Sequence, residues 1–146
     1  MQRPSADTPI VISQSFDTPI DKVWDAITRH DQMVRWFFDS LPYFEAKPGY
    51  EIKFTVTRAF NDGLLHCWKV LEVAAPTTLK IRWEYAGYPG HSIVSWQLSP
   101  TAAGTLLTLT HHGTNQLPRS MFAFTREKIA EGWRFYIQER LANFLQ

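Results

Sequence analysis

The fold is decided by the last part of the chain, residues 120–146, which has the sequence SMFAFTREKIAEGWRFYIQERLANFLQ. This stretch contains no proline, and its one interior glycine, Gly132, directly precedes Trp133. The sequence predicts one uninterrupted amphipathic helix over 120–146, roughly 40 Å long at ~1.5 Å per residue. At 100° per residue, its large apolar side chains fall within a stripe about 100° wide, as expected of a core-facing helix: Phe122, Ile129, Trp133, Tyr136, Ile137 and Phe144.

Upstream of this helix, the chain has strand patterns separated by short turns. The clearest lies over 78–85, where four apolar side chains alternate with charged ones: Leu79, Ile81, Trp83 and Tyr85 against Lys80, Arg82 and Glu84. Links this short favour antiparallel neighbours. Strands are predicted over 10–16, 43–46, 50–59, 64–73, 78–85, 92–98 and 105–112.

Two short helices are expected between the first and second strands. Thr18-Pro19-Ile20-Asp21 predicts a helix start in which Thr18 is the N-cap and Pro19 the first helical residue. Asp31 is predicted to cap a second helix, which Pro42 ends. The sequence therefore predicts an α+β helix-grip fold, in which a seven-stranded antiparallel sheet wraps around the long C-terminal helix. It is expected to form one domain over 1–146, structured from about residue 9.

Composition excludes several classes of protein. A chain of 146 residues with 45% hydrophobic and 20% charged side chains is expected to be globular. Aromatic residues make up 14%, including six Trp and ten Phe, which favours a core or cavity built from large rings. A formal charge of +1 argues against a nucleic-acid surface, and no apolar run is long enough to predict a membrane span. The lone Cys67 suits a reducing compartment, so a cytoplasmic location is expected.

Several stretches resemble a known family. They are FDTPIDKVWDAI over 16–27, Trp36-Phe37-Phe38, Gly49 with Phe54, Trp83, Trp96 with Gly104-Thr105 and Thr110-His111, and Gly132-Trp133. In order and spacing they resemble the family of homologues of the heat-shock-protein-90 ATPase activator, within the START-like, birch-pollen-allergen-like superfamily of polyketide cyclases and lipid carriers. The resemblance covers about residues 9–146 and implies a helix-grip fold with a cavity. It leaves the activity open, because that superfamily hosts carriers, cyclases, receptors and co-chaperones.

No catalytic or metal motif accompanies these patterns. His66 and Cys67 are strand neighbours that face opposite sides, as are His111 and His112, so neither pair can ligate one ion. No metal site, cofactor or catalytic residue is therefore predicted. Cys67 shares a face with Leu65 and Leu71, which suggests a packed thiol. His111 shares a face with Leu107 and Leu109, and is interpreted either as a buried, hydrogen-bonded histidine or as a ligand contact.

Three functions stay open. The favoured one is a module that binds an apolar or amphipathic small molecule between the sheet and the last helix, without covalent chemistry. The alternatives are a cyclase- or hydrolase-like enzyme that uses His111 or Tyr85 as proton carriers, and a co-chaperone-like module that docks a partner on exposed Trp36, Phe37 and Phe38. Whether the chain is a monomer or a homodimer also stays open. The candidate cavity residues are Trp36, Phe37, Phe54, Ile81, Trp83, Tyr85, Trp96, His111, Phe122, Arg126, Trp133 and Tyr136.

Two arginines stand out on the apolar stripe of the last helix. Arg126 and Arg140 both fall within about 20° of the direction of Trp133 on a helical wheel. A buried guanidinium needs water, an acid or an anionic ligand. One interpretation is that both side chains extend to solvent at the ends of the fold. The other places Arg126 at the mouth of the cavity, where it would contact the acidic group of a ligand.

Overall fold

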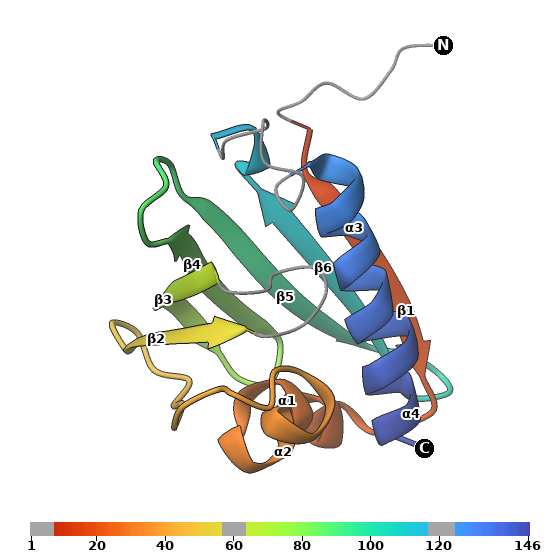
Figure 1. Cartoon of the computed structure of the whole chain (residues 1–146). Helices are drawn as coiled ribbons and strands as arrows, with labels where there is room; N and C mark the ends of the chain where they lie inside the picture. Colours follow the sequence, from red (N-terminus) through yellow and green to blue (C-terminus); the bar gives the residue numbers. More distant parts are fainter. Residues whose placement is uncertain (1–7, 57–63, 117–124) are drawn as a thin grey trace, which may run out of the picture.

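Six strands form one antiparallel sheet with the order β1-β6-β5-β4-β3-β2 (Figure 1). The structure is a computed structural model, and it describes residues 8–56, 64–116 and 125–146. Strands β2 to β6 follow one another in the sheet as they do in the chain, and β1 completes it beside β6. The strands are β1 (Ile10–Phe16), β2 (Glu51–Val56), β3 (Leu64–Ala74), β4 (Thr78–Tyr85), β5 (Ser92–Pro100) and β6 (Thr105–His112).

One face of this sheet carries the core. In β4 the predicted alternation is confirmed, since every second side chain from Leu79 to Tyr85 is buried and those between are partly exposed. The same period of two runs through β2 and β6. In β3 it is interrupted by a bulge between Val70 and Glu72, where Leu71 turns to solvent.

The C-terminal helix covers the inner face of the sheet and runs along β1 (Figure 1). The two short helices lie at one end of the sheet, next to the C-terminal end of that helix (Figure 1). This confirms an α+β fold in which an antiparallel sheet holds a C-terminal helix. The helical segments are α1 (Ile20–Thr28), α2 (His30–Trp36), η1 (Thr114–Gln116), α3 (Arg126–Arg134), the π-helical η3 (Phe135–Leu141) and α4 (Ala142–Phe144).

The last helix differs from its prediction in two ways. The described helix begins at Arg126, where the Thr125 hydroxyl caps it by accepting from the Lys128 amide at 3.4 Å; residues 120–124 lie outside the described residues. It is also not uniformly α-helical, because η3 has wider π turns. A wheel drawn at 100° per residue therefore loses its phase after Arg134.

The sheet has six strands and not seven, because 43–46 does not pair with another strand. Phe44 alone is buried there and packs edge-on against Trp68, whereas Tyr43 is 61% exposed. The Tyr43 carbonyl accepts a hydrogen bond from the Tyr50 hydroxyl at 3.0 Å. Its partner is thus a side chain and not the backbone of a neighbouring strand. The alternation of apolar and polar residues in 43–46 thus comes from the single buried ring of Phe44, and the segment is not a strand of the sheet.

The predicted helix starts also need correction. The N-cap residue of α1 is Pro19, whose side chain has no polar group to accept a hydrogen bond. The Thr18 hydroxyl does not cap the helix and donates to the Leu145 carbonyl at 3.4 Å. In α2 the helix begins at His30, one residue before Asp31, whose carboxylate pairs with Arg29 at 3.2 Å. This helix ends at Trp36, well before Pro42.

Candidate functional site

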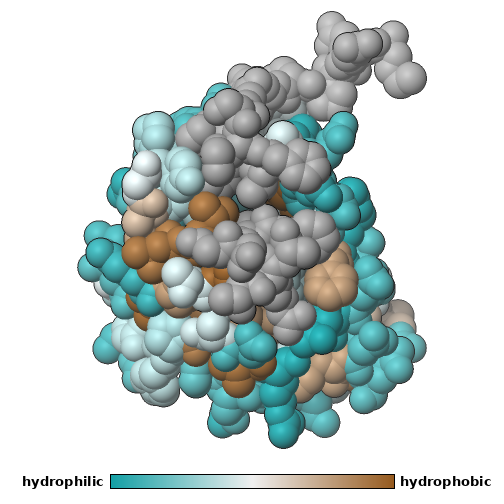
Figure 2. Space-filling view, viewed as in Figure 1, coloured by the Kyte–Doolittle hydropathy of each residue, from teal (hydrophilic) through white to brown (hydrophobic). Residues whose placement is uncertain are grey.

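A small cavity lies between the inner face of the sheet, the end of α2 and one face of α3. Its free volume is about 380 Å³ when the space open to solvent is included, and about 30 Å³ admits the centre of a water molecule. On the face seen in Figure 2, hydrophobic residues gather left of the centre, and hydrophilic ones lie around the edge. The lining residues are Phe37, Phe38, Trp83, Tyr85, His111, Lys128, Ile129, Gly132, Trp133 and Tyr136.

The floor of the cavity is built by aromatic rings from the turn after α2. Phe37 stacks on Phe38 with 4.1 Å between ring centroids, and both rings meet the Tyr136 ring edge-on at 5.1 Å. Trp36 lies behind them, and its indole N–H donates to the Ala26 carbonyl at 2.7 Å. All three residues from Trp36 to Phe38 are at most 2% exposed. The prediction that they form an exposed docking surface is therefore wrong: the chain turns inward at the end of α2.

A chain of hydrogen bonds crosses the buried end of the cavity. The Trp133 indole N–H donates to His111 Nδ1 at 3.0 Å, and His111 Nε2 lies 2.8 Å from the Ser92 hydroxyl. Because an indole can only donate, Nδ1 carries no proton and the neutral ring has its proton on Nε2. His111 thus donates to Ser92, whose hydroxyl is 3.5 Å from the Trp83 carbonyl. This bonding confirms the interpretation of His111 as a buried, hydrogen-bonded side chain.

Burial holds three ionisable groups of this region neutral: His66, Tyr85 and His111. Loss of solvation, with a smaller contribution from the nearby His112, lowers the pKa of His111 to about 3. Loss of solvation likewise lowers the pKa of His66 to about 4, against the opposing effect of the Leu64 carbonyl, which accepts from His66 Nδ1 at 3.1 Å. The pKa of the Tyr85 hydroxyl is raised, again by burial. None of the three changes charge near neutral pH.

Two polar atoms near the cavity lack a hydrogen-bond partner among the described residues. They are Nε2 of His66 and the indole nitrogen of Trp83. The His66 ring is fully buried against Tyr85, with 4.8 Å between ring centroids. Its Nε2 is an acceptor, because Nδ1 donates to Leu64, whereas the Trp83 nitrogen is a donor. An unpaired buried polar atom is costly, so both atoms favour a polar partner such as water.

Half of the candidate cavity residues line this cavity. Phe37, Trp83, Tyr85, His111, Trp133 and Tyr136 come together there. Trp36, Phe54, Ile81 and Trp96 are buried in the core behind the lining, and Phe122 lies outside the described residues. Four further lining residues were not predicted from the sequence: Phe38, Lys128, Ile129 and Gly132. Ile129 lies on the apolar stripe and could have been found, whereas neither a glycine nor a lysine gives a hydropathy signal for a cavity.

Arg126 is not among the residues that line the cavity. Its guanidinium donates to the carbonyls of Thr8 and Pro9, the latter at 3.1 Å, just before β1. Arg140 likewise donates to the carbonyls of Trp36 at 3.2 Å and Arg35 at 3.1 Å, at the C-terminal end of α2. Backbone oxygens thus supply the acceptors that these side chains require, and neither position needs an anionic ligand to explain it.

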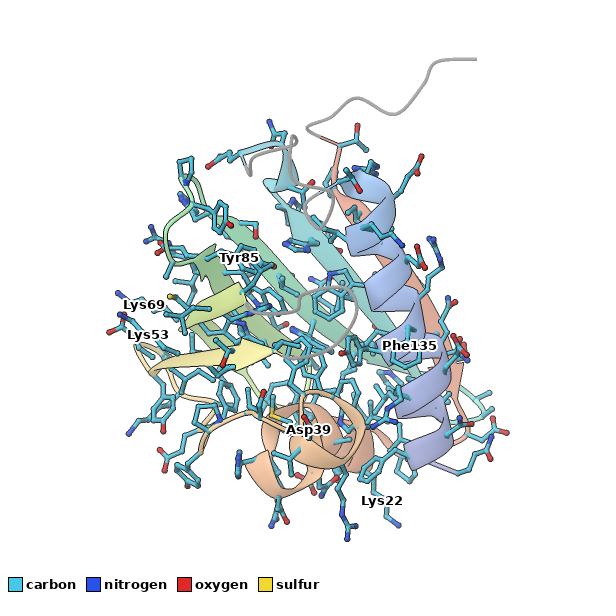
Figure 3. The ribbon with its side chains drawn as sticks, viewed as in Figure 1. Lys22, Asp39, Lys53, Lys69, Tyr85 and Phe135 are labelled. Carbon is cyan, nitrogen blue, oxygen red and sulfur yellow. The ribbon has the colours of Figure 1, made fainter. Side chains whose placement is uncertain are left out.

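Cys67 lies on the outer face of the sheet and not in the core. It is half-buried, and its neighbour Leu65 on that face is exposed. Lys53 and Lys69 flank this region and point away from the core (Figure 3). The shared face of Cys67 and Leu65 was inferred correctly, but apolar residues on a strand do not decide which face is buried. A packed thiol was therefore the wrong interpretation.

The described residues contain neither a metal site nor a membrane-spanning helix. No group of three or more His, Cys, Asp or Glu side chains within 8–56, 64–116 and 125–146 could hold a metal ion. In the same part of the chain, no helix is long and apolar enough to cross a membrane.

Comparisons with known proteins place the chain among relatives of the same fold. A family model described as "Activator of Hsp90 ATPase homolog 1-like protein" matches residues 17–146. A search of curated proteins found no match. CalU16 from Micromonospora echinospora is similar at 27% identity and a TM-score of 0.69, over 99% of this chain and 82% of that protein.

Two further solved structures are similar in fold. DynU16, a protein in the dynemicin biosynthetic locus, has 25% identity and a TM-score of 0.74, over 97% of this chain and 48% of its own. This chain therefore spans about half the length of DynU16. A protein from Arthrobacter aurescens has 18% identity and a TM-score of 0.76, over 95% of this chain and 86% of its own, which shows the fold alone.

Proposed function

This chain belongs to the family of Activator of Hsp90 ATPase homolog 1-like proteins, and from that premise we propose that it binds an apolar or amphipathic small molecule between the sheet and the C-terminal helix, without covalent chemistry. The observation that carries the proposal is the cavity itself. It opens to solvent, and among the ten lining residues that the structure describes, six are aromatic and one, Lys128, is charged. Clefts lined by aromatic rings with few polar groups are typical of small-molecule sites.

The size of the cavity bears on how a ligand would bind. Space for the centre of a water molecule amounts to about 30 Å³, and about 10–15 Å³ of such space suffices for one water. A ligand of several rings would therefore displace side chains around the opening. The rings of Phe37 and Phe38 interact by stacking and make no hydrogen bond to each other. They can therefore shift without leaving a polar group unpaired.

Covalent catalysis fits the same cavity less well. A serine nucleophile needs a histidine nitrogen that accepts its proton, with an acceptor behind the ring to hold the opposite tautomer. Here the Trp133 indole donates to His111 Nδ1, which leaves the proton on the nitrogen that faces Ser92. The geometry therefore works against Ser92 as a nucleophile and His111 as its base. That DynU16 lies in a biosynthetic locus favours a small molecule over a protein partner.

Titration with 1-anilinonaphthalene-8-sulfonate, decanoic acid and decanol tests the proposal. Two-dimensional ¹H–¹⁵N spectra of the tryptophan indoles would be recorded with each probe. We expect a saturable shift of the Trp83 and Trp133 signals, because both rings line the cavity. Trp24 serves as the internal control, since it lies in α1 and does not line the cavity.

Two outcomes would contradict the proposal. One is that no probe shifts either signal at concentrations where the protein stays folded. The other is that the Trp24 signal shifts as much as the other two, which would indicate loose association with the surface.

A further inference from the structure

Gly132 is a glycine in the interior of α3, a position where glycine destabilises a helix relative to alanine. It lines the cavity together with Lys128 and Tyr136, the residues four positions before and after it. These three positions form a row along one side of the helix, next to the buried Trp133.

Among the described residues, neither the backbone nor the packing requires a glycine at this position. Its φ angle is not in the left-handed region, and a Cβ added there would meet no atom of the described residues within 4 Å. Gly104 is different, because a Cβ there would collide with the carbonyl oxygen of Phe16 and approach the Thr18 amide nitrogen to 2.6 Å. Gly104 is therefore a glycine because the turn before β6 lies against the backbone at and just after the end of β1, whereas contacts with the described residues do not explain Gly132.

We propose that Gly132 sets the size of ligand the cavity admits, by leaving the helix side of its opening without a side chain. The inference deepens the proposed function and rests on it. Every other described residue in the row carries a long side chain, and any group larger than hydrogen at Gly132 projects into the space between Lys128 and Tyr136. Gly132 is thus unfavourable for the helix, but its lack of a side chain keeps the opening of the cavity wide.

Two substitutions separate this role from a purely structural one. In Gly132→Ala we expect the urea midpoint of unfolding to rise, since helix propensity improves and no atom is displaced. The affinity for 1-anilinonaphthalene-8-sulfonate should fall at the same time. In Gly132→Leu it should fall by about tenfold or more, because a larger side chain fills the opening.

Two control variants accompany them. Glu127→Leu adds the same side chain to an exposed position of α3 and should leave the affinity for the dye unchanged. Gly104→Ala should lower the urea midpoint, as expected of a glycine required by packing. If the urea midpoint rises in Gly132→Ala and falls in Gly104→Ala, packing requires the glycine at position 104 but not at position 132.

The outcomes distinguish this inference from the function on which it rests. If the wild-type protein binds the dye and both Gly132 variants bind it equally well, the inference is wrong and the proposed function stands. A lower urea midpoint in Gly132→Ala would also overturn the inference, because the glycine would then serve packing. If the wild-type protein binds no probe, the proposed function fails, and the inference fails with it.

Discussion

His66 and His111 are buried on the inner face of the sheet, and burial lowers the pKa of both, to about 4 and about 3. In the unfolded chain both rings would titrate near 6.5. Below that pH the unfolded state binds more protons than the folded state, so acid favours unfolding. Above about pH 7 neither ring is charged in either state, and stability should not change through them.

We therefore expect the free energy of unfolding to fall as the pH drops from about 6.5 towards 4. Each histidine contributes up to roughly 1.4 kcal/mol per pH unit. Urea unfolding at a series of pH values measures this slope. His111→Gln should reduce the slope by about one proton. If the free energy of unfolding of the wild type does not change between pH 6.5 and 4, the two histidines do not have lowered pKa values in the folded state.

Trp133 combines the largest buried ring of α3 with a hydrogen bond to His111. Trp133→Ala should lower the free energy of unfolding by about 3–5 kcal/mol, because the remaining cavity cannot be refilled. Trp133→Phe keeps most of the ring and should cost about 1–3 kcal/mol, mainly through the unpaired His111 Nδ1. Urea midpoints compare the two variants with Tyr43→Ala, an exposed ring whose loss should cost little. Equal losses for Trp133→Ala and Tyr43→Ala would refute this.

Among the elements, Arg140 joins the C-terminal helix to the end of α2. Its guanidinium binds the carbonyls of Arg35 and Trp36. These are among the last carbonyls of α2, where the helix dipole favours a positive charge. The contact fixes the turn that places Phe37 and Phe38 in the cavity floor.

Arg140→Leu should therefore destabilise the protein by about 1–3 kcal/mol, because it leaves these carbonyls without their donor. Amide hydrogen exchange would show where the loss acts. We expect faster exchange in α2 before any change in β4 or β5. Arg134→Leu, at an exposed position one helical segment earlier, is the matched control. Unchanged exchange in α2 would show that the arginine contributes nothing to the position of that helix.

Elements with one dominant signal could be predicted from sequence, and those with competing signals could not. The period of two in β4 specifies its buried face, because a slip by one residue would bury three charges. The segment 43–46 has the same alternation, but a single buried ring produces it there. The π turns of η3 have no counterpart in hydropathy. The helical wheel put Arg140 on the apolar stripe, whereas its side chain reaches the carbonyls of α2.

The cavity, too, could be predicted from the sequence only in part. Its large rings were visible in the sequence, since Trp83, Tyr85, Trp133 and Tyr136 all lie on inward-facing patterns. Two properties decide what the rings surround: the tautomer of His111 and the open space beside Gly132. Both depend on which side chains face each other across the molecule, and a linear pattern does not contain that information.

For the whole molecule, ligand binding should appear as added stability. A ligand that binds only the folded state stabilises it by about 2.7 kcal/mol at a concentration of 100 times its Kd. For a chain of this length, that corresponds to a rise in Tm of about 5–10 °C. Thermal unfolding with decanoic acid and with decanol measures the rise for both probes. A probe that shifts the indole signals but leaves Tm unchanged would have to bind the unfolded chain equally well.

The side chains of the C-terminal helix also hydrogen-bond to the edge strand β1 and to the residue just before it. Arg126 donates to the carbonyl of Pro9, and Gln138 donates to the carbonyl of Ser13 at 3.2 Å. Residues of this helix follow all six strands in the chain, so the ribosome makes them after the sheet they complete. A nascent chain that ends before Arg126 has an uncovered apolar face and an open edge at β1, both of which invite association. Stable folding should therefore begin only once α3 and η3 have left the exit tunnel, which force-profile measurements on stalled chains of increasing length would detect as a single late peak.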